Sequence, residues 1–199
     1  MSHRTYPRIK ISLVVLLFLI LVVLFILISL SLFGLAFRKL GFPPEYSVYF
    51  LFLSLLGSYV NIPVRKVERS TIIAINLGGA IIPVAMSVFL FTMVSPVNAL
   101  IGVLVVVFFI YKIARPVKGS GIAVHAVLPP LLATATALMI SPQDAAIIAY
   151  ISGTLGCLIG ADILNLKKIP DLGVPLVSIG GAGTFDAIFL TGIVSVLLA

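Results

Sequence analysis

Two acidic residues inside otherwise apolar stretches are the strongest candidates for chemistry in this 199-residue chain. Asp162 lies near the end of one apolar stretch, shortly before Lys167, and Asp186 lies early in the next. A carboxylate in bilayer hydrocarbon costs at least about 2.5 kcal/mol. We therefore predict that both side chains face a protein interior or a water-filled cavity, or bind a proton. The other acidic residues lie in or beside expected loops: Glu45, Glu68, Asp144 and Asp171.

Glycines and small polar residues surround the two aspartates. Each glycine lowers helix stability by roughly 1 kcal/mol relative to alanine, so the cluster before Asp186 predicts a helix break or a close backbone contact. A break frees amides and carbonyls to bind an ion or a small anion. The predicted ion or substrate site comprises Asp162, Asn165, Gly180, Gly181, Gly183, Thr184, Asp186 and Asn76.

Structural roles are the alternative for these aspartates. Asp162 is close enough to a helix end to contact Lys167, and Asp186 can accept hydrogen bonds from Thr184 or Thr191. The single cysteine, Cys157, lies in an apolar run, where a buried side chain is expected. The two histidines, His3 and His125, are far apart, so the sequence predicts no metal and no cofactor.

The composition places these residues in a membrane protein. The chain is 61% hydrophobic and 10% charged, whereas soluble domains carry roughly 25% charged residues. Its net charge is +7, but the basic residues occupy short gaps between apolar runs. That pattern fits a lipid bilayer as the partner and excludes nucleic acid.

The apolar runs predict an all-α, polytopic fold with about seven transmembrane helices, since a crossing needs about 20 residues. With a cytoplasmic N-terminus, all of the 13 basic residues except Arg38 and Lys39 fall on the cytoplasmic side of the cell membrane, as the positive-inside rule requires. The expected spans are 11–37, 46–63, 70–91, 97–111, 122–140, 144–166 and 174–199.

Two pairs of segments suggest an internal duplication within one transmembrane domain, 1–199. Residues 56–66 resemble 159–168, and Asn76-Leu-Gly-Gly-Ala resembles Ser178-Ile-Gly-Gly-Ala. The interpretation is a parallel 3+1+3 repeat with a first half (1–92), a linker helix and loop (93–121) and a second half (122–199). Ser152, Gly156 and Gly160 form a small-residue stripe that predicts close helix packing.

The segments Gly160-Ala-Asp-Ile-Leu-Asn-Leu and Ser178-Ile-Gly-Gly-Ala-Gly-Thr-Phe-Asp resemble the signature of a prokaryotic multi-pass membrane family known only as a domain of unknown function. This resemblance implies a membrane protein and no particular activity. A second resemblance is to presenilin-like intramembrane aspartyl proteases, which carry one catalytic aspartate on each of two successive helices, the second directly after Gly-x-Gly. It implies catalytic roles for Asp162 and Asp186. Two residues, Thr184 and Phe185, separate Asp186 from Gly181-Ala-Gly183. The third motif of these proteases is Pro-Ala-Leu, and its nearest match here is Pro130-Leu131.

The sequence leaves three functions open. An ion- or proton-coupled carrier or channel for a small solute leads narrowly among the specific activities. An aspartyl protease with Asp162 and Asp186 as acid and base is the second, and a membrane scaffold without catalysis is the third. A homo-oligomer is compatible with each of them.

Overall fold

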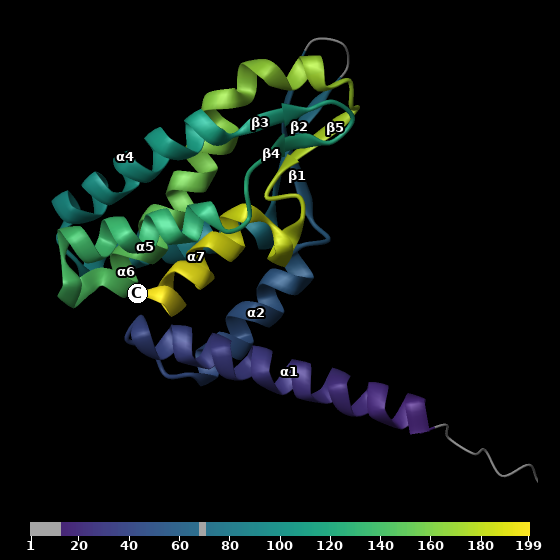
Figure 1. The fold of residues 1–199 in the computed structure, drawn as a ribbon. Helices are drawn as coiled ribbons and strands as arrows, with labels where there is room; N and C mark the ends of the chain where they lie inside the picture. Colours follow the sequence, from purple (N-terminus) through teal and green to yellow (C-terminus); the bar gives the residue numbers. More distant parts are fainter. Residues whose placement is uncertain (1–12, 68–70) are drawn as a thin grey trace, which may run out of the picture.

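The computed structural model describes residues 13–67 and 71–199, and this part of the chain is mostly helical (Figure 1). The predicted basic positions Arg4, Arg8, Lys10 and Arg69, with His3 and Glu68, lie outside the described residues. The α-helices are α1 (Leu13–Lys39), α2 (Glu45–Gly57), α3 (Ile82–Leu90), α4 (Pro96–Ile113), α5 (Leu128–Ile140), α6 (Ala145–Cys157) and α7 (Ala187–Leu198). The strands are β1 (Asn61–Lys66), β2 (Ile72–Asn76), β3 (Arg115–Val117), β4 (Gly121–Ala123) and β5 (Leu176–Ile179).

Short π- and 3₁₀-helical segments extend or interrupt several of these helices. The π-helices are η2 (Leu77–Ile81), which leads into α3, and η5 (Leu158–Asp162), which continues α6. The 3₁₀ segments are η3 (Phe91–Met93), η4 (Pro142–Asp144), η6 (Ile163–Leu172) and η7 (Gly183–Phe185). Asp162 and Asp186 therefore lie where regular α-helix has ended or has not yet begun.

Three helical segments in the described part of the chain are long and apolar enough to cross a membrane: Val14–Lys39, Pro96–Ile113 and Pro142–Leu172. Four further apolar helices are shorter: Glu45–Gly57, Leu77–Met93, Leu128–Ile140 and Ala187–Leu198. A helix of 13 residues, such as α2 or α5, rises only about 20 Å. Helix length alone therefore does not establish the predicted seven crossings.

A small β-sheet corrects the prediction of an all-α fold. Residues predicted as ends of the second, third and seventh spans instead form a sheet with strand order β1-β2-β5. β1 is antiparallel to β2 from Asn61↔Asn76 to Lys66↔Ile72, and β2 is parallel to β5, with Ala74 opposite Ser178. Isoleucine-rich runs such as 72–75 suit strands, and short apolar runs cannot be told from helix by periodicity. A separate β3–β4 hairpin forms the loop that had been expected between the fourth and fifth spans.

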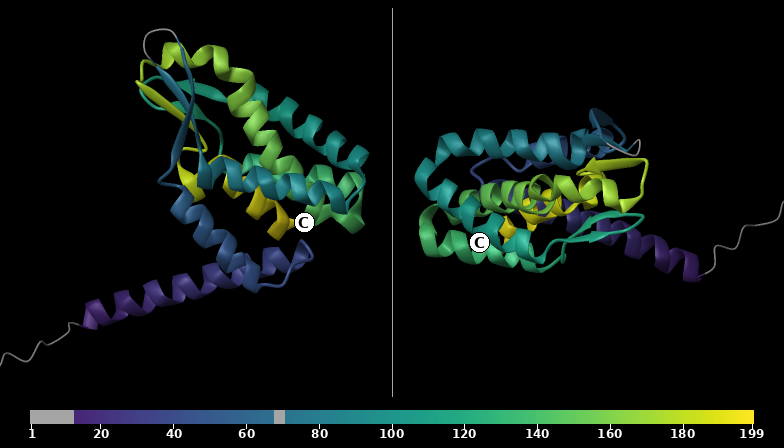
Figure 2. Two further views of the ribbon diagram at one scale, coloured as in Figure 1. Left: turned by 180° about the vertical axis from the view of Figure 1, so that it is seen from behind. Right: turned by 90° about the horizontal axis from the view of Figure 1, so that it is seen from above.

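The connections lie at two opposite ends of the molecule (Figures 1 and 2). The sheet, the β3–β4 hairpin and η6 lie at one end, here called the sheet end. The turns that join α1 to α2, α3 to α4 and α5 to α6, together with the C-terminus, lie at the other. The described basic residues predicted to be cytoplasmic belong to elements at the sheet end or to the end of α4 that leads into it: Arg65, Lys66, Lys112, Arg115, Lys118, Lys167 and Lys168.

The core centres on α6, which packs against α4, α5 and α7 and is buried along most of its length. Aromatic contacts help to join α1 and α2 to this bundle. The ring centroids of Phe37 and Phe50 are 5.4 Å apart, and those of Phe50 and Phe189 are 5.6 Å apart. Lys39 Nζ donates to the carbonyl of Leu197 at 3.1 Å, which ties the end of α1 to the end of α7. The first part of α1, residues 14–28, is exposed.

The predicted packing role of the small-residue stripe is confirmed. A Cβ added to Gly156 would lie 2.7 Å from the Cβ of Val106, and one added to Gly160 would lie 2.8 Å from the carbonyl oxygen of Val107. Real Cβ atoms do not approach so closely. These two glycines therefore allow α6 and η5 to lie directly against α4.

Replacing Gly156 with alanine is expected to lower the free energy of unfolding by about 1–3 kcal/mol, the usual cost of overpacking. The intrinsic helix preference predicts the opposite sign, a gain of about 1 kcal/mol. Gly34→Ala in α1 is the matched control, because its nearest atom, Pro44 Cβ, would be 3.4 Å away. Thermal unfolding in detergent checks both variants, and equal melting temperatures would contradict this packing argument.

Candidate functional site: a cavity with two carboxylates

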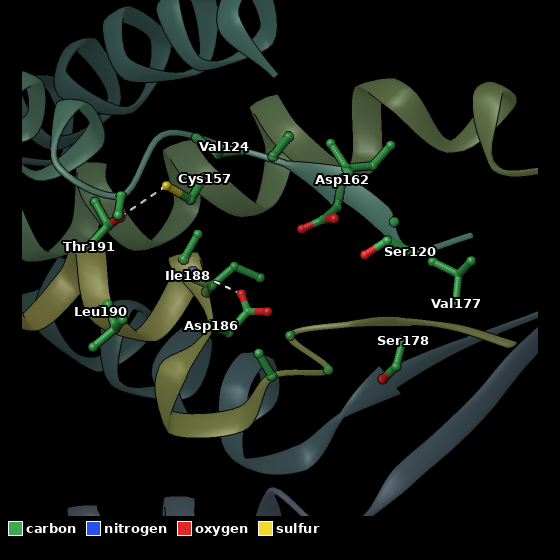
Figure 3. Close-up of a pocket in the computed structure, with 18 residues that line it drawn as sticks. Ser120, Val124, Cys157, Asp162, Val177, Ser178, Asp186, Ile188, Leu190 and Thr191 are labelled. Carbon is green, nitrogen blue, oxygen red and sulfur yellow. Dashed lines mark hydrogen bonds between the residues drawn. The ribbon is translucent and has the colours of Figure 1, made fainter. Parts of the chain in front are cut away.

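Asp162 and Asp186 line one cavity of about 470 Å³ at the sheet end (Figure 3). Asp162 is the last residue of η5, and Asp186 is the residue that caps the N-terminus of α7. Ser120, Gly121 and Ile122 of the β3–β4 hairpin form one wall, and Val177 and Ser178 of β5 belong to another. Figure 3 shows both carboxylates directed into the space between the hairpin and β5. Tertiary structure thus brings the two strongest sequence candidates together.

A glycine-rich turn positions Asp186. The chain leaves β5 and turns back through Gly180 and Gly183, which have φ of 72° and 63°, in the left-handed region that favours glycine. The amide of Gly183 donates to the carbonyl of Gly180 at 2.9 Å. After η7, Asp186 Oδ1 accepts the amide of Ile188 at 3.0 Å and so caps α7. The break predicted before Asp186 is therefore present.

A change of helix type positions Asp162. The chain passes from the π-helix η5 into the 3₁₀-helix η6 at this residue. Asn165 holds the junction, because its Nδ2 donates to the carbonyls of Gly160 at 3.1 Å and Ala161 at 2.8 Å. Lys168 Nζ donates to Asn165 Oδ1 at 2.7 Å. The side chain of Asp162 has neither a hydrogen bond nor an ion pair to any described residue, so its carboxylate is available to the cavity.

The cavity contains two acidic side chains and no compensating cation among its described lining residues. Neighbouring carboxylates that share one site cannot both ionise cheaply. Such a pair either shares a proton or binds a cation. A shared proton suits acid–base chemistry, and a bound cation suits ion coupling. The pair of carboxylates therefore distinguishes this cavity from an ordinary polar pocket.

The other predicted site residues have different positions. Gly180 and Gly181 line the cavity, whereas Gly183, Thr184, Asn165 and Asn76 do not. Asn165 and Asn76 are fully buried, and their side-chain amides bond to protein groups. Their observed interactions are structural and support the elements that carry the cavity.

Asn76 links β2 directly to β1 and, through Asn61, to β5. Its Nδ2 donates to the carbonyl of Ser58 at 2.8 Å and to Asn61 Oδ1 at 3.0 Å, and its Oδ1 accepts the amide of Gly79 at 2.8 Å. Ser178 Oγ donates to the same oxygen of Asn61 at 2.5 Å. Asn76 and Ser178, which begin the two similar glycine motifs, therefore share one hydrogen-bond acceptor.

Glycines bring three backbones into contact beside the cavity. A Cβ on Gly79 would lie 2.7 Å from the carbonyl oxygen of Gly183 and closer still to that of Gly180. A Cβ on Gly78 would lie 2.9 Å from the carbonyl carbon of Gly57 and would collide with the carbonyl of Ser54. This glycine contact, formed by residues 54–58, 78–80 and 180–183, fixes the turn that carries Asp186 against α2 and η2.

Several cavity residues were not predicted from the sequence. Ser120 and Gly121 belong to a segment expected only to be a loop, and no local signal places that loop over Asp162. Thr191 and Cys157 also line the cavity, where Cys157 Sγ donates to Thr191 Oγ1 at 3.3 Å. Cys157 is buried, as expected.

The sequence also allowed a hydrogen bond from Thr191 to Asp186. In the structure, Asp186 Oδ1 instead accepts the Ile188 amide, and Thr191 Oγ1 accepts the thiol of Cys157.

Two further features bear on the chemistry. No group of three or more metal-binding side chains of the His, Cys, Asp and Glu types occurs among the residues that the structure describes. Pro130 and Leu131, the nearest match to the third presenilin-like motif, do not line the cavity of the two carboxylates. Leu131 instead lines a separate pocket with His125.

Fold and site together define a mostly helical protein with apolar helices and a two-carboxylate cavity at the junction of a small sheet and the helix bundle. The family described as "Protein of unknown function (DUF1614)" matches residues 40–198, and the chain belongs to this family. The predicted resemblance to a domain of unknown function is thereby confirmed. No curated protein and no solved structure matches the chain.

Proposed function

We propose that this chain is a multi-pass protein of the cell membrane, with about seven crossings and the sheet end on the cytoplasmic side. The two-ended arrangement of the connections supports this orientation, because the loops rich in lysine and arginine gather at one end. An open sheet edge is not tolerated against lipid hydrocarbon. The sheet therefore belongs at the aqueous interface or against protein, and the shorter helices complete their crossings in contact with the bundle.

We further propose that Asp162 and Asp186 form the catalytic pair of an intramembrane aspartyl protease. The observation that carries this proposal is the convergence of both carboxylates on one cavity that has a strand as part of its wall. Two nearby carboxyl groups, one protonated and one ionised, are suited to acid–base hydrolysis. The site also lies at the end of the bundle where water from the cytoplasm would have access.

In the proposed reaction, the ionised carboxylate takes a proton from water as the water oxygen bonds to the peptide carbonyl carbon. The other carboxyl group gives its proton to the carbonyl oxygen. When the tetrahedral intermediate collapses, the C–N bond breaks and the nitrogen leaves with the proton taken from water. The acidic group recovers its proton from a hydroxyl of the intermediate. Asp186, held by the Ile188 amide, is suited to the base, and Asp162 to the acid.

β5 offers a means of positioning a peptide. It is an outer strand of the sheet, and it pairs with β2 on one side only. Val177 and Ser178 of this strand line the cavity, so an extended peptide added to its other edge would pass beside both carboxylates. Strand addition of this kind binds a backbone through main-chain hydrogen bonds. The proposed substrate is therefore a transmembrane peptide that unwinds near the cytoplasmic interface.

A reconstituted cleavage assay tests this function. The purified protein would be placed in liposomes with a transmembrane reporter peptide, and the products would be mapped by mass spectrometry. A peptide with two glycines near the cytoplasmic interface is expected to be cut faster than its all-leucine counterpart, because glycine weakens the helix. If neither peptide is cut, or a variant lacking both carboxylates cuts them equally well, the protease proposal fails.

An ion- or proton-coupled carrier is the second candidate, and the interrupted helices favour it. β2 leads through Gly78-Gly79 into α3, and β5 leads through Gly180-Gly181 to α7, so two similar broken segments lie in parallel beside the site. Broken helices bind coupling ions in many transporters. A carrier predicts a melting temperature raised by one cation among Na⁺, Li⁺, K⁺ and Ca²⁺. Binding at a hundredfold excess over Kd adds about 2.7 kcal/mol, and Asp162→Asn should remove the effect.

A further inference from the structure

A second cavity, of about 580 Å³, lies between the sheet and η6 at the sheet end. Three cationic residues are among those that line it: Arg65 and Lys66 of β1 and Lys167 of η6. No acidic residue is found among its described lining residues, and all three cations are exposed. This concentration of positive charge on one concave surface favours an anionic ligand.

The floor of this basic cavity is apolar and continues into a groove. Ile73, Ile75 and Ile179 of the sheet and Ile163 of η6 contribute to the floor. A neighbouring apolar groove of about 310 Å³ runs between η5 and α3 and is lined by three of these same isoleucines, Ile75, Ile163 and Ile179. The basic cavity and the apolar groove therefore form one continuous surface, with cationic residues at one end and apolar side chains at the other.

We propose that this surface binds an anionic glycerophospholipid. Its phosphate-bearing headgroup would lie among Arg65, Lys66 and Lys167, and one acyl chain would lie along the groove beside Ala85. The arrangement of cationic residues beside an apolar groove fits a phospholipid, because a free phosphate would leave the groove uncovered. The position also fits, since the sheet end is the proposed cytoplasmic interface, where anionic lipids attract basic residues. This inference uses the proposed membrane location but not the chemistry of the aspartates.

Lipid titration of the purified full-length protein tests the proposal. Native mass spectrometry would measure the affinities for phosphatidylglycerol and phosphatidylcholine with identical acyl chains, and inorganic phosphate would be a third ligand. Phosphatidylglycerol is expected to bind more tightly. The triple variant Arg65→Gln, Lys66→Gln, Lys167→Gln should weaken that binding by about a hundredfold, since each cation near an anionic lipid contributes roughly a factor of five.

Two matched variants separate the lipid site from general charge and from misfolding. Lys112→Gln, Arg115→Gln, Lys118→Gln removes the same charge from residues that do not line this cavity, and it should change the affinity by less than about threefold. Ala85→Trp fills the groove at an exposed position and should weaken lipid binding while preserving the net charge. Melting temperatures would establish that each variant is folded.

Three results would overturn the proposal. These are equal affinity for the two lipids, equal losses in the two triple variants, or displacement of the lipid by inorganic phosphate at comparable concentration. Asp162→Asn should bind the lipid normally. Because the readout is binding, a protein that cleaves no peptide can still confirm the lipid site. Extraction of the chain from cell membranes only by detergent checks the membrane location separately.

Discussion

Asp186→Asn is expected to abolish peptide hydrolysis while leaving the fold almost unchanged. Asparagine caps helices as well as aspartate does, so its side-chain oxygen can still accept the Ile188 amide at the start of α7. It cannot take a proton from water, however. Loss of a general base or acid lowers rates by about 10²–10⁴-fold, and the cleavage assay in liposomes measures this loss directly.

Asp162→Asn should have an equally large effect on hydrolysis for the complementary reason. The amide keeps the shape of the side chain but cannot give the carbonyl oxygen a proton. Since the side chain of Asp162 bonds to no described residue, its replacement breaks no interaction that supports η5, and the melting temperature should be maintained or raised. Removal of either member of a working pair should cost about as much as removal of both.

Asp144→Asn is the matched control for both variants. Asp144 lies beyond α5, at the end opposite the cavity, where its Oδ2 accepts the hydroxyl of Ser141 at 3.0 Å. Its replacement should leave cleavage within about twofold, because it lies outside the cavity. Full activity in Asp162→Asn or Asp186→Asn, with circular dichroism and melting temperature like the parent, would exclude the catalytic pair.

Gly79→Ala is expected to have the largest effect on stability of any substitution considered. The added Cβ would collide with the carbonyl oxygens of Gly180 and Gly183. These are backbone atoms of the turn that carries Asp186, so the strain cannot be relieved by rotating a side chain. We expect a loss of about 3 kcal/mol or more, the upper part of the range for overpacking, together with displacement of the cavity wall.

Gly121→Ala provides the comparison for Gly79→Ala, because a Cβ there meets no atom within 4 Å. Its free energy of unfolding should change by less than about 0.5 kcal/mol, as for most substitutions that meet no packed neighbour. Denaturant unfolding in detergent, followed by circular dichroism, measures both. A Gly79→Ala variant as stable as Gly121→Ala would show that the backbones at the glycine contact separate easily.

Local sequence identified the parts of this molecule whose signal lies in a single stretch of chain. Long uncharged runs predicted the helices. An apolar side chain can be buried against any apolar neighbour, so this signal does not depend on a particular distant residue. The glycines at 180–183 predicted the break before Asp186, since glycine disfavours helix wherever it occurs. Asp162 and Asp186 were selected on the cost of a carboxylate in an apolar stretch, which also depends on the immediate neighbours alone.

Tertiary structure decided what depends on partners distant in the chain. Residues 61–66, 72–76 and 176–179 became strands because each found hydrogen-bonding groups on another segment, which no local period reveals. Asn76 became a structural link because Ser58 and Asn61 lie within reach of it. The sequence therefore determined which residues are chemically unusual. Only the packing of η5, the β5–α7 turn and the hairpin around one space determined that two of them share a cavity.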